Sequence, residues 1–362
     1  MHETHDLRVE TMLPLATPQA IKAELPLTER AAETVSRARF EIEAILDGRD
    51  GRQLVIVGPC SIHDPEAAKR YAQELQILRA RHAGELLVVM RGYFEKPRTS
   101  VGWKGLINDP HLDGTCDVAH GLRVARKLLL ELAEMGMPTA NEALDPVMPQ
   151  YLADLISWSA IGARTTESQT HREMASGLSM PVGFKNGTDG GLDVAINAMR
   201  AARAPHSFVG IDGTGCVAVV RTRGNPYSHA VLRGGRNGPN FDEAEVNAAA
   251  RQLSAAGLQA RVLIDCSHDN SRKNHQNQAI AASDVAAQIA RGSRHVLGVM
   301  LESNLVAGRQ DLVDKSSLVF GQSITDACID LPATALVLDE LAGAVRHARQ
   351  ASSRLATGSA HL

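Results

Sequence analysis

Residues that can bind anions or metal ions recur where apolar runs of this sequence end. Cys60 ends the first run, Arg91 the second and Glu142 the third. A lone arginine is commonly an ion-pair partner, and a lone cysteine is commonly a small core residue. Repetition at seven ends instead indicates that one edge of a fold gathers these side chains. Arg164, Lys185, His268 and Glu302 stand at the ends of the later runs.

Four cations form the first chemical group. They are Arg91, Arg164, Lys185 and, in a further segment, Arg233. Guanidinium groups bind phosphate and carboxylate through two parallel hydrogen bonds, and lysine adds a point charge. Because four such cations in one place would repel one another, an anionic ligand is needed to neutralise them. The sequence therefore predicts a small substrate that carries both phosphate and carboxylate.

Cys60, His268, Glu302 and Asp326 form the second group. Asp326 lies in "GQSITDACID", in a long segment after the last apolar run. Segments of that length are usually functional. A set of sulfur, nitrogen and oxygen donors suits Mn²⁺, Fe²⁺, Co²⁺ or Zn²⁺ and does not select among them. The spacing contains no CxxC-type metal motif, so four unrelated residues remain the alternative.

The elements that must position these residues alternate between strands and helices. Strand-like runs and helical patterns in alternation indicate a parallel sheet. Eight such units predict an α/β protein with a (β/α)8 TIM barrel, whose active-site face lies at the carboxyl ends of the strands. A doubly wound sheet is the alternative. The expected strands cover 54–60, 86–94, 138–143, 160–165, 181–187, 206–211, 261–268 and 296–303, and the expected helices cover 27–47, 65–82, 121–136, 147–158, 168–178, 190–203, 242–257, 278–291 and 331–349.

Three regions are expected along the chain. Residues 1–48 form an N-terminal arm and helix, 49–350 the catalytic barrel, and 351–362 a polar tail. Within the barrel, Cys216–Val220 and His229–Gly234 flank the turn "RGNP" and are expected to form an inserted β-hairpin.

Composition and charge exclude several classes of protein. A net charge of −3 gives no reason to expect nucleic-acid binding. No apolar run approaches the length of a membrane span, and the first residues lack the apolar core of a signal peptide. Five scattered cysteines argue against a disulfide framework. We therefore expect a cytoplasmic protein with neither nucleic-acid nor membrane partners.

Several long blocks closely resemble one enzyme family. They are "GPCSIHDP" (58–65), "FEKPRTSVGWKGLINDP" (94–110), "GARTTESQTHRE" (162–173), "PVGFKNGTDG" (181–190), "LRGG" (232–235), "DCSHDNS" (265–271) and "SITDAC" (323–328). In order from about residue 6 to 347, the chain is similar to class I 3-deoxy-arabino-heptulosonate 7-phosphate (DAHP) synthases, also called phospho-2-dehydro-3-deoxyheptonate aldolases. The resemblance implies a transferase that condenses phosphoenolpyruvate with erythrose 4-phosphate and water in the first step of the shikimate pathway to the aromatic amino acids.

The resemblance also implies roles for individual residues. Cys60, His268, Glu302 and Asp326 match the family's metal ligands. Glu142 matches a carboxylate near phosphoenolpyruvate, Lys96 could protonate the new alkoxide, and either Glu142 or His268 could steer the attacking water. Arg91, Arg164, Lys185 and Arg233, with the backbone near Ala163, match the phosphoenolpyruvate site, and Lys96, Pro97, Arg98 and Thr99 match the segment that receives erythrose 4-phosphate.

Blocks such as "EALDPVMPQYL" (142–152) look most like the tyrosine-sensitive form of the family. By analogy, feedback inhibition by tyrosine is expected at a remote pocket lined by Pro149, Gln150, Met174, Ser179 and Phe208. The N-terminal arm would be ordered by a partner subunit, which implies a homodimer or homotetramer. Cys328 is expected either to form an inactivating disulfide with Cys60 or to be an inert buried thiol.

Three other functions compete with this interpretation. An octulosonate 8-phosphate synthase would use arabinose 5-phosphate, but the block "KPRTSVGWKGL" and the N-terminal extension favour the four-carbon aldose. A catalytically silent subunit that binds aromatic amino acids would be expected to lack metal ligands, and all four are present. A phosphate-binding barrel without a metal would be insensitive to chelators.

Overall fold

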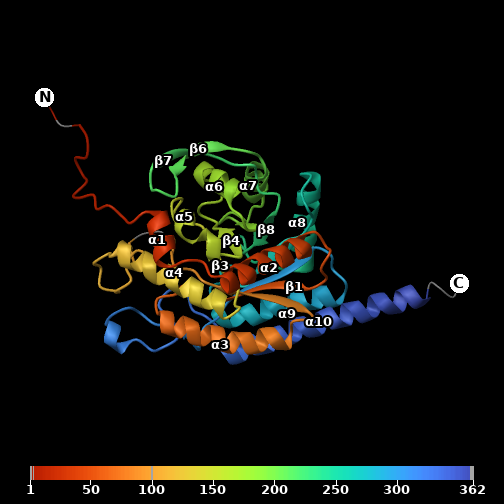
Figure 1. The fold of residues 1–362 in the computed structure, drawn as a ribbon. Coiled ribbons are helices and arrows are strands. Elements are labelled where there is room, and N and C mark those ends of the chain that lie inside the picture. The colour runs from red at the N-terminus through yellow and green to blue at the C-terminus, as the bar shows by residue number, and fades with distance from the viewer. Residues whose placement is uncertain (1, 3, 99–100, 359–362) are drawn as a thin grey trace.

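A closed barrel of eight parallel strands forms the centre of the computed structural model, which describes residues 2, 4–98 and 101–358 (Figure 1). Around the barrel the strands follow the order β1-β10-β9-β8-β5-β4-β3-β2. This confirms the predicted (β/α)8 architecture. The barrel strands are β1 (Gln53–Gly58), β2 (Leu86–Arg91), β3 (Thr139–Glu142), β4 (Trp158–Ile161), β5 (Val182–Lys185), β8 (Ser228–Leu232), β9 (Val262–Asp265) and β10 (Val296–Glu302).

The sixth barrel strand differs from the prediction. The expected sixth strand, residues 206–211, pairs instead with β7 (Val217–Arg221) as β6 (Ser207–Ile211), in an antiparallel hairpin outside the barrel. His229–Gly234, expected in the hairpin, covers all but the first residue of β8, which pairs with β5 and β9 inside the barrel. Burial explains the exchange, because every residue of β8 is buried whereas those of β6 are exposed or half-buried.

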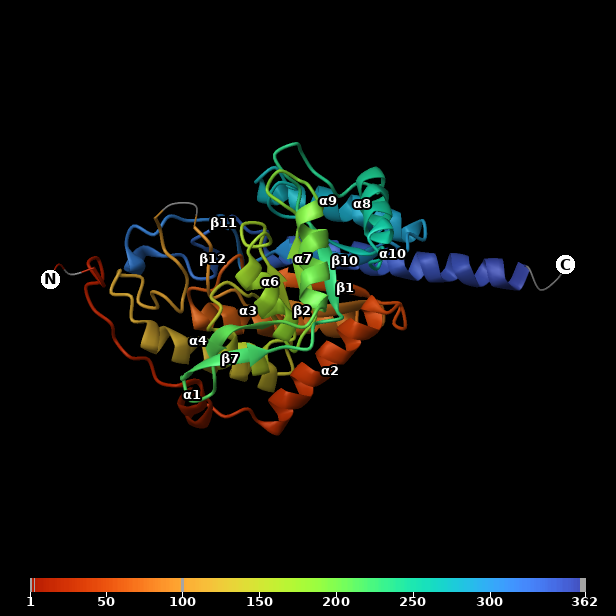
Figure 2. The same cartoon turned by 90° about the horizontal axis from the view of Figure 1, so that it is seen from above.

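The helices surround the barrel and follow the expected alternation (Figure 2). Thr28 caps α2 by accepting from the Ala31 N–H, and Asp64 caps α3 by accepting from two N–H groups. Gly136 follows α4 with a φ of +82°, a conformation that favours glycine. The principal helices are α1 (Pro18–Glu24), α2 (Glu29–Leu46), α3 (Pro65–Arg81), α4 (Val118–Glu134), α5 (Pro149–Leu152), α6 (Gln169–Gly177), α7 (Asp193–Arg203), α8 (Glu243–Ala255), α9 (Gln278–Ala290) and α10 (Leu331–Gly358).

The two ends of the chain depart from the expected elements. A short helix, α1, forms inside the segment that was expected to be an irregular arm. The last helix, α10, was expected to end near residue 349 but runs to Gly358 and projects beyond the barrel (Figures 1 and 2). The short strands β11 (Val306–Arg309) and β12 (Gln322–Ser323) give structure to the long segment after β10. None of the described helices has the length and hydropathy needed to cross a membrane.

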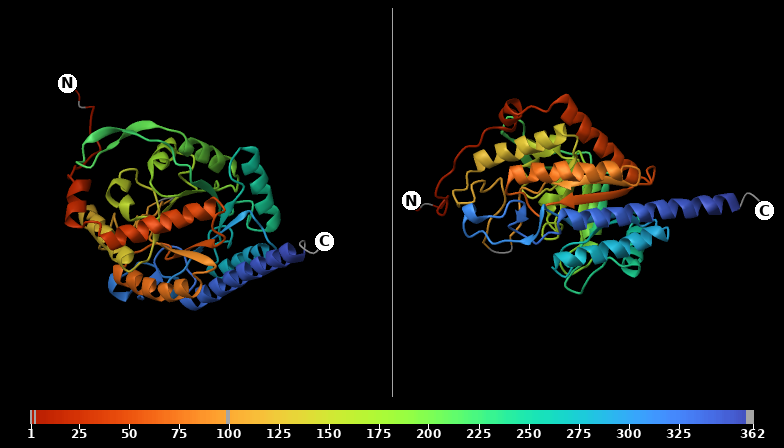
Figure 3. Two further views of the ribbon diagram at one scale, coloured as in Figure 1. Left: turned by 45° about the vertical axis from the view of Figure 1, so that its right-hand side comes forward. Right: turned by 90° about the horizontal axis from the view of Figure 1, so that it is seen from below.

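Helix α2 packs against the amino ends of the strands, leaving their carboxyl ends free for the site (Figure 3). Ile42, Ile45 and Leu46 of α2 are buried in one apolar cluster with the barrel side chains Leu54 and Leu87. Apolar burial of this kind stabilises by roughly 25 cal/mol per Å² removed from water. At the same end, the guanidinium of Arg261, just before β9, donates to the Ile45 carbonyl oxygen.

Candidate functional site

Each of the eight barrel strands ends in, or is followed within three residues by, a residue that the sequence singled out. The corrected strand order adds Arg233, which directly follows β8, to the seven strand ends that were predicted. Because the strands are parallel and the barrel is closed, their carboxyl ends surround one mouth. In strand order, the mouth receives Cys60, Arg91, Glu142, Arg164, Lys185, Arg233, His268 and Glu302.

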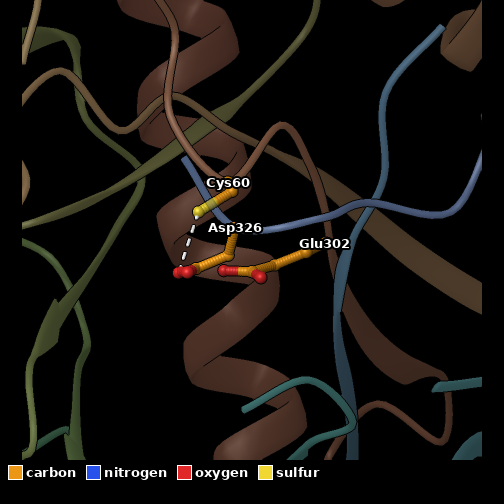
Figure 4. Close-up of side chains that lie close together, drawn as sticks. All are labelled: Cys60, Glu302 and Asp326. Atoms are coloured by element: carbon orange, nitrogen blue, oxygen red, sulfur yellow. Dashed lines mark hydrogen bonds between the residues drawn. The ribbon is translucent and has the colours of Figure 1, made fainter. Parts of the chain in front are cut away.

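Three of the four predicted metal ligands lie together. One donor atom each from Cys60, Glu302 and Asp326 falls within 4.8 Å of the other two. Figure 4 shows the two carboxylates side by side, with the Cys60 sulfur hydrogen-bonded to Asp326. Cys60 and Glu302 are buried, whereas the Asp326 side chain is 65% exposed. The cluster therefore has a buried floor and an open side facing the mouth.

Hydrogen bonds hold this cluster from behind. The Gln278 amide donates to the Glu302 carbonyl oxygen at 3.0 Å, and its Oε1 accepts from the Glu302 N–H at 2.8 Å. Ser61 and Thr325, neighbours of Cys60 and Asp326, share a hydrogen bond of 2.6 Å between their hydroxyls. This contact ties the long segment after β10 to the end of β1, which explains how residues 266 positions apart meet.

His268, the fourth predicted ligand, lies outside this group of three. Its Nδ1 is 3.0 Å from Asp265 Oδ2 and 2.6 Å from the Ser267 hydroxyl. Although burial opposes the change, Lys96 and then His268 lower the pKa of the Asp326 carboxyl. His268 has a φ of +55°, a left-handed conformation that costs a non-glycine residue about 1–2 kcal/mol. Strain of this size is common where a functional side chain is held in place.

Lys96 lies directly against the cluster. Its Nζ is 3.0 Å from Cys60 Sγ and 3.8 Å from Asp326 Oδ2. Burial disfavours the ammonium, but the Cys60 sulfur and the charges of Glu302 and Asp326 outweigh it and raise the Lys96 pKa. Burial, followed by Glu302, raises the pKa of the Cys60 thiol to about 12. The thiol donates to Asp326 at 3.3 Å, so without a metal ion the proton stays on sulfur.

The donor set fits a divalent transition metal ion. A buried thiol with a pKa near 12 loses its proton readily only when a cation replaces it. Sulfur with two carboxylates, and an imidazole close by, suits the borderline metals from Mn²⁺ to Zn²⁺. The free imidazole edge of His268 would supply a fourth donor, and its Nδ1 is oriented by Asp265, as metal-binding histidines usually are.

The four predicted cations occupy different environments around the mouth. Arg91 is fully buried, with Nη2 3.2 Å from Glu302 Oε1, and its guanidinium lies over the Tyr93 ring at 3.9 Å. Lys185 is buried and forms a 2.8 Å ion pair with Asp265. Arg233 pairs with Asp269. Arg164 and the preceding Ala163 lie at the rim, where Arg164 is exposed.

The segment expected to receive the aldose leaves the mouth toward solvent. Exposure increases from buried Lys96 through half-buried Pro97 to exposed Arg98, and Thr99 lies outside the described residues. Glu142 is buried at the end of β3, and its Oε1 lies against Gly162. A Cβ at position 162 would lie 2.2 Å from that oxygen. Burial, with added repulsion from Asp145 and Glu142, raises the pKa of Glu95 to about 8.

Asp265 is a site residue that the sequence reasoning missed. Its carboxylate is fully buried and contacts both Lys185 and His268. The Ser267 hydroxyl also donates to it, at 2.6 Å. Although burial opposes ionisation, Lys185 and His268 lower the Asp265 pKa well below its ordinary value. Its position at the carboxyl end of β9, as for the other site residues, was the available signal.

A separate cavity of about 510 Å³ is lined by all five predicted effector residues. It lies between α2, α5, α6 and the β6–β7 hairpin, away from the cysteine–carboxylate cluster. Its volume is typical of a small-molecule site. The lining includes Lys22, Arg39 and Asp154, and the predicted residues in it are Pro149, Gln150, Met174, Ser179 and Phe208.

Cys328 is buried close to Cys60. The Cys328 thiol donates to the Asp326 carbonyl oxygen at 3.6 Å, and burial raises the Cys328 pKa well above its ordinary value. A thiol in this state reacts slowly. Both thiols are free in the structure, so the inactivating disulfide stays a prediction.

Comparisons with known proteins agree along most of the chain. The tyrosine-sensitive phospho-2-dehydro-3-deoxyheptonate aldolase of Escherichia coli K12 is 56% identical over 328 residues, covering 90% of this chain and 92% of that protein. The phenylalanine-sensitive enzyme of the same strain is 53% identical over 348 residues, 96% of this chain and 99% of that protein. A solved structure of the Francisella tularensis SCHU S4 aldolase matches with a TM-score of 0.92 and 47% identity, covering 94% of this chain and 99% of that chain. The family model described as "DAHP synthetase I family" matches residues 24–339, and the chain therefore belongs to that family.

Proposed function

We propose that this protein condenses phosphoenolpyruvate with erythrose 4-phosphate and water, giving DAHP and inorganic phosphate. The observation that carries the proposal is the barrel mouth, where a cysteine–carboxylate cluster lies beside buried cations. Family membership, and relatives named for this activity, support it. The reaction opens the shikimate pathway to the aromatic amino acids. The free cysteines support a reducing, cytoplasmic location.

The proposed cofactor is one divalent ion held by Cys60, Glu302 and Asp326, with His268 as the fourth ligand. When bound, such an ion polarises the aldehyde oxygen of erythrose 4-phosphate as a Lewis acid. Mn²⁺, Fe²⁺, Co²⁺ and Zn²⁺ all suit these donors. Lys96, which contacts Cys60 and Asp326, would lie beside that oxygen.

The cations of the mouth hold phosphoenolpyruvate and the charge that develops on it. Carbon 3 of phosphoenolpyruvate attacks the aldehyde, water adds at carbon 2, and collapse of that adduct releases phosphate. Lys185 and Arg233 would bind the substrate's anionic groups, with Arg164 and the Ala163 backbone completing the site at the rim. As the phosphate leaves, fixed cations stabilise its charge without reorganising.

Lys96 and Glu142 are the proposed proton-handling groups. The raised pKa of Lys96 keeps its ammonium protonated, so it can donate to the alkoxide formed from the aldehyde. Glu142, buried at the end of β3, would orient the attacking water, with His268 as the alternative. Arg98, with Pro97 and Thr99, would receive the phosphate of the aldose at the open end.

One assay tests this function. Phosphate release from phosphoenolpyruvate and erythrose 4-phosphate should stop after EDTA treatment and return with Mn²⁺. Arabinose 5-phosphate, the substrate of the octulosonate 8-phosphate alternative, should release far less phosphate. No turnover with either aldose, in protein that still binds metal, would contradict the proposal and leave a binding or regulatory barrel.

The second proposed ligand is tyrosine, as a feedback inhibitor in the 510 Å³ cavity. Lys22 and Asp154 lie 4.0 Å apart at its wall and offer opposite charges for the carboxylate and ammonium of an amino acid. Met174, Leu178 and Phe208 provide an apolar lining for a ring. Relatives named as tyrosine-, phenylalanine- and tryptophan-sensitive differ little in identity, so titrating all three amino acids decides the effector.

The active form is proposed to be a homodimer or homotetramer. Residues of the arm before α1 leave the body of the protein with their apolar side chains exposed: Leu7 by 66%, Met12 by 69% and Leu13 by 80%. Val209, Val217 and Val219 on the hairpin are at least 68% exposed. The arm joins α1 beside that hairpin, because the Gln19 N–H of α1 donates to the Gly213 carbonyl oxygen at 2.8 Å. A second copy could cover both surfaces symmetrically.

A further inference from the structure

A third cavity lies near the amino ends of β1 and β2, at the opposite end of the barrel from the cysteine–carboxylate cluster. Its volume is about 520 Å³, close to that of the proposed effector cavity. Helices α2 and α3 form its walls, and Ala80, Ala83, Leu86 and Leu87 add apolar surface. The volume and the mixed lining are typical of a small-molecule site.

Three arginines and a single carboxylate among its lining residues give this cavity an excess of positive charge. Arg37 and Glu41 come from α2, Arg52 precedes β1, and Arg79 comes from α3. Arg52 directs its shortest ion pair to Asp50, with Nη2 2.6 Å from Oδ2, and only a longer contact of 3.5 Å to Glu41. Glu41 is therefore the lining carboxylate available to balance the other two guanidinium groups.

The other two arginines are weakly neutralised. Arg37 lies 3.6 Å from Glu33, but both side chains are more than half exposed, and exposed pairs of this kind contribute little. Arg79 donates Nη1 to an uncharged acceptor, the Gly136 carbonyl oxygen, at 2.9 Å. Burial lowers the Arg79 pKa; the charge of Glu41 opposes this, and the charges of Arg37 and Arg52 lower the pKa further. A bound anion would relieve this repulsion.

We propose that this cavity binds a small organic anion that carries either a phosphate or a pair of carboxylates. Guanidinium forks from opposite walls match the geometry of both groups. Ala80, Ala83 and the two leucines would contact the ligand's hydrocarbon part. The site is independent of the proposed synthase reaction, because none of its lining residues belongs to the mouth.

Calorimetric titration of inorganic phosphate and, separately, succinate into the purified protein tests the proposal. The mouth also binds anions, so the titrations are run in an Arg164→Gln background, which removes an exposed cation there. In this background, Arg79→Gln should weaken anion binding at least tenfold. Arg37→Gln, a substitution at an exposed site, should weaken anion binding by at least the same factor. Arg70→Gln, also on α3 but paired with Glu74 at 2.7 Å, is the matched control and should change nothing.

The two ligands distinguish the two chemistries. Binding of phosphate alone assigns the cavity to phosphate esters, and binding of succinate alone assigns it to dicarboxylates. Neither Arg37→Gln nor Arg79→Gln should alter turnover when made in the otherwise unchanged protein. The proposal is overturned if neither anion binds, or if both arginine variants bind as tightly as Arg70→Gln.

Discussion

Asp265 joins the two chemical groups of the proposed site. It pairs with Lys185 of the cation group and orients His268 of the metal group. The sequence indicated both partners because each stands among the cations and possible metal ligands that recur at the ends of the apolar runs. It did not indicate Asp265, because a strand-end aspartate has no distinguishing spacing and its role depends on two partners from different strands.

Asp265→Asn should therefore impair both groups at once. The amide keeps the size of the carboxylate but leaves the Lys185 ammonium buried without its anion, a loss that typically costs 3–5 kcal/mol. We expect kcat/KM for phosphoenolpyruvate to fall at least about 100-fold, and metal affinity to fall by roughly 10–100-fold as for other residues that orient metal ligands. Kinetics and metal analysis at graded free Mn²⁺ measure both.

The control is Asp284→Asn on α9, whose carboxylate accepts from Gln288 at 2.7 Å, far from the mouth. It should retain both activity and metal. If Asp265→Asn lowers thermal stability but leaves KM and metal affinity unchanged, Asp265 has a purely structural role and its assignment to the site is wrong.

His229, buried in the barrel strand β8, should make the stability of the protein depend on pH. Its Nε2 accepts from the Trp158 indole N–H at 3.1 Å, and burial lowers its pKa to about 4. The unfolded chain binds this proton near pH 6.5, so between pH 6.5 and 4 the unfolded state holds more protons than the folded state. Stability must therefore fall as the pH decreases through this window, by up to about 3 kcal/mol at its lower end.

His229→Gln should remove this part of the acid sensitivity. Urea unfolding at pH 7 and pH 4.5 should show a loss of stability that is smaller by about 2–3 kcal/mol in the variant than in the unchanged protein. His347→Gln, at an exposed position of α10, serves as the control and should not change the difference. Equal losses in all three proteins would mean that His229 is not held neutral.

At the scale of elements, the sequence predicted the strand–helix alternation and failed at one exchange. The run 206–211 resembles a strand, and it is one, but it lies in the hairpin. The sixth barrel strand contains His229, in the segment that was assigned to the hairpin because it follows the turn "RGNP". The hydropathy pattern of the sequence indicates which residues form strands. Which strands pair depends on long-range contacts such as that of His229 with Trp158.

The contact of β10 with β1 depends on a glycine. Gly298 has a φ of +144° and sits where the register between β10 and β9 shifts. A Cβ at this position would lie 1.8 Å from the Leu54 carbonyl oxygen, so Gly298→Ala requires the two strands to separate. We expect a loss of more than about 3 kcal/mol in the free energy of unfolding, measured with urea.

Gly84→Ala is the matched control for this change. It lies in the turn before β2, and a Cβ there meets nothing within 4 Å. Its effect should stay within about 0.5 kcal/mol, typical of surface substitutions. Similar losses for the two variants would show that the contact between β1 and β10 tolerates a wider spacing than the structure has.

The β6–β7 hairpin forms one wall of the proposed effector cavity and therefore allows a test of tyrosine inhibition. Phe208 lines the proposed effector cavity, whereas Ser207 on the same strand is exposed. Phe208→Ala should raise the tyrosine concentration for half-inhibition at least tenfold while uninhibited turnover stays the same, because the mouth is separate from the cavity. Ser207→Ala should inhibit normally. Unchanged tyrosine sensitivity in Phe208→Ala would place the effector elsewhere.

At the scale of the molecule, the barrel has three candidate sites on different faces: the mouth, the proposed effector cavity and the arginine-lined cavity. The proposed catalytic mouth uses the carboxyl ends of the strands, and the arginine-lined cavity lies near the amino ends. Helix α2 contributes to two of them, with Arg39 toward the effector cavity and Arg37 toward the arginine-lined one. Sequence motifs located the mouth, but the arginine-lined cavity has no local pattern, because its residues come from separate elements.

The exposed arm should be what joins subunits. Deleting residues 2–15 leaves α1 intact, because its cap Thr17 and first residue Pro18 remain. It removes Leu7, Met12 and Leu13, whose exposure in one chain favours burial against another. Light scattering should show a smaller assembly. Tyrosine should also inhibit more weakly, because the arm joins α1 beside the hairpin that lines the effector cavity.

Met12→Ser with Leu13→Ser should act in the same direction, whereas Glu10→Gln, in the same arm, should have no effect. An unchanged mass after the deletion would exclude the arm as the connection between subunits and leave the exposed valines of the hairpin as the remaining apolar surface to test.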